Sequence, residues 1–60
     1  MQTKLSDSEL AVIMLEAEAR KLDSALPLDV RIRSSETYAL ALREASNRGY
    51  DYQSIAALAA

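Results

Sequence analysis

The chain has 60 residues, no Cys and no His, and a formal net charge of −2. The missing Cys excludes disulfides and thiolate metal sites, and the missing His removes the commonest general base and metal ligand. No apolar run approaches the roughly 20 residues of a membrane span. We therefore expect a cytoplasmic protein outside the membrane, with no enzymatic activity, metal or cofactor. It forms one domain (1–60), either by itself or as a piece of a longer protein.

The clearest element is a helix predicted over residues 6–26. Ser6 stands three residues before Glu9, which is the spacing of a capping box. Asp7 and Glu9 place negative charge at the positive end of the helix dipole. Pro27 ends the pattern, because the residue before a proline is pushed out of helical geometry.

Apolar residues repeat along this helix at steps of three and four, as in a coiled-coil seam. The seam consists of Leu5, Val12, Leu15, Ala19, Leu22 and Leu26, and further apolar residues flank its first half. A helix that is apolar nearly all round is buried on more than one side. Two interpretations stay open: a core helix of a small bundle, or a helix that also forms an interface. The predicted self-association or partner interface is Leu10, Val12, Ile13, Met14, Leu15, Ala19 and Leu22.

Residues 28–33 alternate between apolar and charged side chains, and the alternation indicates a short extended link. Leu28, Val30 and Ile32 would then face one way. A single strand of about six residues needs a partner, and the chain offers no second strand. The partner strand would come from another subunit, or the segment is a linker or joins the next helix.

Two further helices are predicted over residues 35–48 and 52–59. Ser34 and Ser35 would cap the first of them, and Gly49 is the expected left-handed residue after its end. Asp51 would cap the last helix. The predicted fold is an all-α, three-helix module, and we expect a homodimer, because domains this small usually need additional support.

Charge divides unevenly along the chain. Residues 1–29 hold three basic and six acidic residues, a formal charge of −3, whereas residues 30–60 hold four Arg and three acidic residues, a charge of +1. The net charge of −2 argues against general binding of nucleic acid, although a modest basic face in the second half is compatible with it. Nucleic acid is therefore a possible partner but not the favoured one.

Residues 30–58 resemble ribbon-helix-helix repressors, through the run Val30 to Arg33, the serines that follow, and a helix that ends at Gly49. In that family two chains each contribute one strand to a ribbon that enters the DNA major groove. The resemblance implies a dimer with one strand per chain. It implies that Arg31 and Arg33 read bases, and that the backbone of Tyr52 and Gln53 holds phosphate.

Residues 5–12 are similar to a helix start in the Hha/YmoA proteins, small helical modulators that act through contacts with a DNA-binding partner. The favoured hypothesis is a non-enzymatic regulatory module, of the kind that phages and plasmids encode. It self-associates and binds a protein partner. The alternative is a ribbon-helix-helix-like transcriptional repressor.

Overall fold

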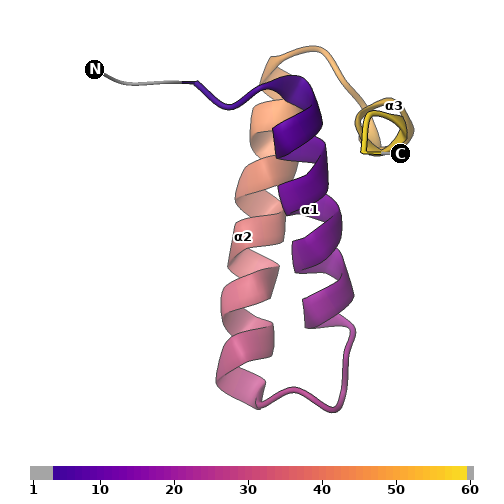
Figure 1. Cartoon of the computed structure of the whole chain (residues 1–60). Helices are drawn as coiled ribbons and strands as arrows, with labels where there is room; N and C mark the ends of the chain where they lie inside the picture. The colour runs from indigo at the N-terminus through magenta and orange to yellow at the C-terminus, as the bar shows by residue number, and fades with distance from the viewer. Residues whose placement is uncertain (1–3, 60) are drawn as a thin grey trace.

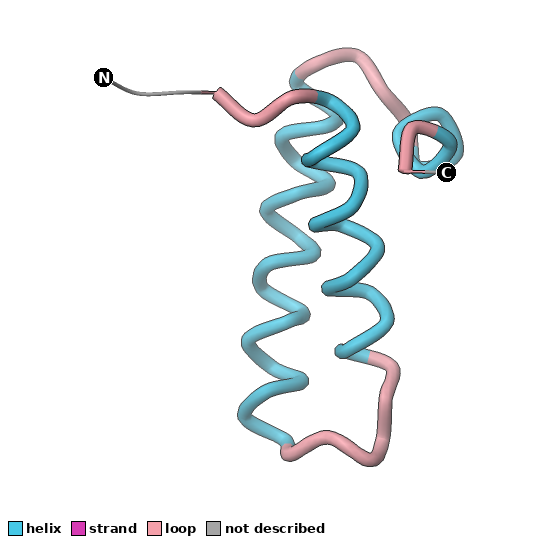
Figure 2. Tube along the Cα trace, viewed as in Figure 1, coloured by secondary structure: helices cyan, strands magenta, loops and turns pink. Residues whose placement is uncertain are grey.

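A computed structural model describes residues 4–59, and these form three helices and no strand. They are α1 (Asp7–Lys21), α2 (Leu28–Asn47) and α3 (Tyr52–Ala57). The first two form an antiparallel hairpin, and α3 packs mainly against α1 while also touching α2 (Figures 1 and 2). The all-α prediction is confirmed for the described residues, and each of the three helices contacts the other two, with α1 and α2 packed most extensively.

Both predicted caps of α1 and α3 are present. At α1 the Ser6 N–H donates to Glu9 Oε1 at 2.8 Å, and the Glu9 N–H donates to Ser6 Oγ at 3.1 Å. At α3 the Ser54 N–H donates to Asp51 Oδ1 at 2.8 Å, and the Asp51 N–H donates to Ser54 Oγ at 3.0 Å. These reciprocal bonds satisfy N–H groups that have no partner within the helix.

Helix α1 ends at Lys21, so the predicted end at residue 26 is wrong. Asp23 makes a local turn instead: its Oδ1 accepts the Ala25 N–H at 3.0 Å, and its carbonyl accepts the Leu26 N–H at 3.1 Å. Short polar side chains such as Asp compete with the helix for nearby backbone donors. The heptad pattern extends to Leu26, but the hydrogen bonds made by Asp23 end the helix at Lys21.

The predicted extended link over residues 28–33 is also wrong, and the alternative that the segment joins the next helix is confirmed, because these residues form the first turns of α2. Pro27 is the N-cap, and its carbonyl accepts the Arg31 N–H at 3.1 Å. A six-residue strand without a neighbour leaves its backbone groups unpaired, whereas a helix pairs them within the segment. The predicted start at residue 35 is therefore seven residues late. Ser34, expected to cap, is buried inside the helix.

The end of α2 follows the sequence prediction. Gly49 has φ +92°, the left-handed conformation expected after the helix. The Tyr50 N–H donates to the Ala45 carbonyl at 2.9 Å, and the Gly49 N–H donates to the Ser46 carbonyl at 3.0 Å. This pair of bonds is the Schellman motif, and it turns the chain toward α3.

The core lies between the N-terminal half of α1, the C-terminal half of α2 and the face of α3 turned toward them. Its largest fully buried side chains are Met14 of α1 and Ile55 of α3. The remaining buried members are Leu10, Ala11, Ala41 and Ala45. The residues that α2 contributes to this cluster are small alanines, so most of its volume is filled by Leu10, Met14 and Ile55.

Candidate interaction surface

The structure separates the predicted interface residues into two groups. Leu10 and Met14 belong to the intramolecular core, and Leu15 is half-buried against it. The other four remain accessible to a partner, fully or in part: Val12, Ile13, Ala19 and Leu22. The core is thus built mainly from the flanks of the predicted seam, and three of the four accessible residues, Val12, Ala19 and Leu22, come from the seam itself.

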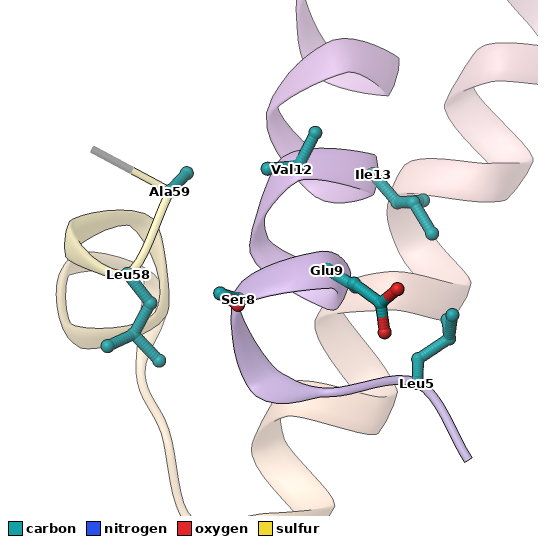
Figure 3. Close-up of a pocket in the computed structure, with 7 residues that line it drawn as sticks. All are labelled: Leu5, Ser8, Glu9, Val12, Ile13, Leu58 and Ala59. Carbon is teal, nitrogen blue, oxygen red and sulfur yellow. The ribbon is translucent and has the colours of Figure 1, made fainter. Parts of the chain in front are cut away.

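Apolar side chains of α1, of α2 and of the residues that flank α1 and α3 line two neighbouring hollows. One open hollow, of about 470 Å³, is lined by Leu5, Ser8, Glu9, Val12, Ile13, Leu58 and Ala59 (Figure 3). A second, of about 260 Å³, is lined by Leu5, Leu10, Ile13, Thr37, Leu40, Ala41 and Glu44. Leu5 and Ile13 line both. We call the apolar members that reach the surface the apolar band: Leu5, Val12, Ile13, Leu40, Leu58 and Ala59.

The charged residues that line these hollows are acidic. Glu9 lines the first and Glu44 the second, and no Lys or Arg lines either. Glu16 is exposed one turn beyond Val12, on the same side of α1. The band therefore presents apolar surface with carboxylates at its edges.

A polar network fixes the α3 side of this surface. Arg48 Nη1 donates to Asp7 Oδ1 at 2.7 Å, and Arg48 Nε donates to Glu44 Oε2 at 2.9 Å. The Tyr50 hydroxyl donates to the other oxygen of Asp7. The Tyr52 hydroxyl donates to Glu18 Oε1 at 2.8 Å. The bonds to Asp7 join the start of α1 to the residues that end and follow α2, and the bond to Glu18 joins the last part of α1 to the first residue of α3.

The same contacts change the acidity of the groups involved. The hydrogen bond from Tyr50, followed by the one from Arg48, holds the pKa of Asp7 below its ordinary value of 3.8. The bond to Asp7 raises the pKa of Tyr50, and the bond to Glu18 raises the pKa of Tyr52. Burial raises the pKa of Tyr38. All three tyrosines therefore stay protonated at neutral pH, and two of them serve as hydrogen-bond donors.

A second group of exposed aliphatic side chains lies near the connection between α1 and α2. Leu22 is 72% exposed, Leu28 63% and Ile32 53%. We call these three residues the turn-end patch. Leu22 belongs to the predicted interface set. Leu28 and Ile32 were assigned to the extended link, and the helical geometry of α2 instead places them one turn apart on its outer side.

The residues proposed for DNA binding do not converge on one surface. Arg31 and Arg33 lie in the second turn of α2, where Arg31 Nε donates to the Leu26 carbonyl at 3.2 Å. Tyr52 and Gln53 open α3 near the other end of the hairpin (Figure 1). The Asp51 carboxylate already occupies the Ser54 N–H in that first turn.

The described residues contain no group of three metal-ligating side chains that could hold an ion. None of their helices is both long and apolar enough to cross a membrane. The chain matches no family model, no curated protein and no solved structure.

Sequence reasoning missed several surface residues. Leu40, Leu58 and Ala59 were not assigned to any interface, although they complete the apolar band. Leu40 could have been noticed, because Tyr38, Ala41 and Ala45 recur at steps of three and four along one face of their helix and Leu40 lies outside that face. The position of Leu58 opposite Ser8 (Figure 3) required the packing of α3 on α1.

Proposed function

We propose that this protein is a non-enzymatic regulatory module that binds a protein partner through the apolar band and self-associates through the turn-end patch. The observation that carries the proposal is the exposure of large aliphatic side chains over much of so small a chain. Leu40 is 65% exposed in the band, and all three residues of the turn-end patch are more than half exposed. Contiguous exposed apolar surface marks interaction sites.

The polar groups support a non-enzymatic role. Asp7, Glu9 and Asp51 each accept hydrogen bonds that cap a helix or fix helix packing. Glu18 accepts from Tyr52. We place the protein in the cytoplasm, as its cysteine-free sequence predicts.

Self-association is proposed at the turn-end patch because it is the more exposed of the two surfaces. Small domains are commonly stabilised by association, since their own core contributes little. Burying Leu22, Leu28 and Ile32 against a second copy would remove three aliphatic side chains from water, at roughly 1.5–3 kcal/mol for each fully buried one.

Sedimentation velocity over a concentration series tests this assignment. The wild type is expected to shift toward a dimer with rising concentration. Ile32→Glu is expected to stay monomeric and to melt at the temperature that the wild type shows at concentrations where it is monomeric. Val12→Glu, in the apolar band, serves as the matched control and should still self-associate. Leu15→Glu should unfold the chain instead, because Leu15 packs on the core. A wild type that stays monomeric at every concentration would contradict the self-association.

The same samples distinguish the DNA-binding alternative. If Arg31 and Arg33 contact phosphates, addition of the protein at low salt would raise the anisotropy of a labelled duplex. The affinity would then fall steeply as salt is added. An Arg31→Ala and Arg33→Ala double variant would then lose binding. No binding at low salt favours the protein-binding module.

A further inference from the structure

One side of α2 carries a line of uncharged side chains next to the face that packs on the core. Their positions advance by four and three residues in turn, the spacing that keeps side chains on one side of a helix. Four of them each follow by one position a residue that faces the interior, as Leu42 follows Ala41, so they point about 100° away from the core. Five of the six are exposed and Leu42 is half-buried. We call this line the α2 strip: Leu28, Ile32, Ser35, Ala39, Leu42 and Ser46.

Charged residues border the strip on its outer side. Asp29, Glu36 and Arg43 each follow a member of the strip by one position, and all three are exposed. Within residues 4–59 both ion pairs involve Arg48, so these three charges have no ion-pair partner there, although Arg33 lies one turn from two of them. The outer border therefore presents charges of both signs.

The opposite border of the strip is covered by α1. Ala45 on that border is buried, and Tyr38 lies against the Lys21 ammonium of α1. Its charged residue, Arg31, donates to the Leu26 carbonyl. Two antiparallel copies related by a two-fold axis through the strip would bring like borders together, covered beside covered and charged beside charged. A parallel pair would instead press each charged border toward α1 of the other copy.

One antiparallel alignment overlaps the strip along its whole length. Small side chains then lie at the centre of the contact, where the distance between two helices depends on the side chains that meet. Because the interface is symmetric, every contact occurs twice. The alignment places these residues opposite each other, one from each copy: Leu28 and Ser46, Ile32 and Leu42, and Ser35 and Ala39.

The same alignment brings opposite charges together on the outer border. Asp29 of each copy lies about 3 Å along the axis from the level of Arg43 of the other copy, and symmetry gives this pair twice. Glu36 approaches its own copy across the two-fold axis, so two attractive pairs oppose one repulsive pair. A shift of one heptad in one direction would pair Asp29 with Glu36, which is unfavourable. A shift in the other direction would pair Glu36 with Arg43, but it would leave Leu28 and Ile32 beyond the end of the partner helix.

We propose that two copies of this chain pair along the α2 strip as an antiparallel, two-fold dimer, in which Asp29 of each copy meets Arg43 of the other. This inference rests on the self-association in the proposed function, since it names what covers the α2 part of the turn-end patch. Leu28 and Ile32 of one copy pack against the last turns of α2 of the second copy. Apolar burial supplies affinity, and the charged border sets the direction and register.

A charge exchange tests the pairing. Asp29→Arg and Arg43→Asp are made singly and together, and the dissociation constant of the dimer is measured by sedimentation velocity over a concentration series. Each single variant brings like charges together at both pairs and is expected to weaken dimerisation about tenfold. The double variant restores opposite charges and should return the dissociation constant to within about threefold of the wild-type value.

Matched controls place the same changes away from the strip. Glu16→Arg and Arg20→Asp, one turn apart on the exposed side of α1, should leave the dissociation constant unchanged, singly and together. Ala39→Glu, at the centre of the strip, should prevent dimerisation, because it buries a charge without a partner. Thr37→Glu, on another side of α2, should not. Melting curves by circular dichroism at monomeric concentrations verify that each variant is folded.

The outcomes separate the alignment from self-association itself. A wild type that stays monomeric would contradict both. A dimer that is lost in Ile32→Glu but unaffected by Ala39→Glu would retain self-association through the turn-end patch and overturn the pairing along α2. A double variant that dimerises no better than Asp29→Arg or Arg43→Asp alone would overturn the charge pairing and its register, as would single variants that dimerise like the wild type.

Discussion

The two ends of the α1–α2 hairpin are held by different kinds of contact. At the α3 end, Asp7, Arg48 and Tyr50 form a bonded network, and Ile55 enters the core beside Met14. At the turn end, the Lys21 ammonium lies 4.2 Å from the centre of the Tyr38 ring. The aliphatic side chains of the turn-end patch there face water.

This difference shows how a chain of 60 residues can combine stability with exposed apolar surface. The α3 end contains the core and its polar supports, so it holds the helices in place. The turn end contributes little burial of its own, and its exposed residues are the ones that we propose for self-association. The apolar band lies over the stable end, so the proposed partner would bind a preformed surface, which lowers the entropic cost of binding.

The largest effect is expected from truncation of the core at the α3 end. Met14→Ala should lower the free energy of unfolding by about 2–5 kcal/mol, because Met14 is fully buried. Urea unfolding followed by circular dichroism measures the change. Leu22→Ala at the turn end is the matched control and should change the value by less than about 0.5 kcal/mol under monomeric conditions.

Where Met14→Ala is unfolded in water, Met14→Leu replaces it, since a swap of similar volume costs less than about 1.5 kcal/mol. Equal losses from Met14→Ala and Leu22→Ala would contradict the division between a stable end and an open end.

A smaller effect is expected at the connection between α2 and α3. Gly49→Ala should cost about 1–2 kcal/mol, because alanine is strained in the left-handed conformation that Gly49 adopts at φ +92°. No atom lies within 4 Å of the added Cβ, so the cost arises from the backbone alone. Gly49→Asn should cost less, since Asn tolerates this conformation. Thermal melting compares the two variants, and equal melting temperatures for Gly49→Ala and the wild type would contradict the left-handed assignment.

The smallest effect concerns pH. Because hydrogen bonds from Tyr50 and Arg48 lower the pKa of Asp7 in the folded state, its contribution is fully present above its ordinary pKa of 3.8. That contribution disappears as the pH falls through the lowered value. The melting temperature should therefore drop in acid, and less steeply in Asp7→Asn than in the wild type. Glu36→Gln, on the exposed side of α2, should follow the wild-type curve. Parallel curves for Asp7→Asn and the wild type would show that Asp7 is not responsible.

The sequence by itself determined the local features of this fold. Ser6 with Glu9, Asp51, and Gly49 fixed where α1 and α3 begin and where α2 ends, because each cap uses bonds between residues a few positions apart. The all-α class followed from the same signals. Apolar residues also recur at helical spacing in the sequence of α2 and α3, and three of them, Ala41, Ala45 and Ile55, are buried in the structure.

Tertiary structure decided what local patterns left open. The alternation over residues 28–33 suited a strand, but no strand was available for pairing, and the segment extended α2 instead. Helix α1 had more apolar residues than one face could bury. The approach of α2 and α3 placed Leu10 and Met14 inside and left Val12 and Leu22 accessible, because burial depends on which neighbours cover a face and a heptad count contains no neighbours.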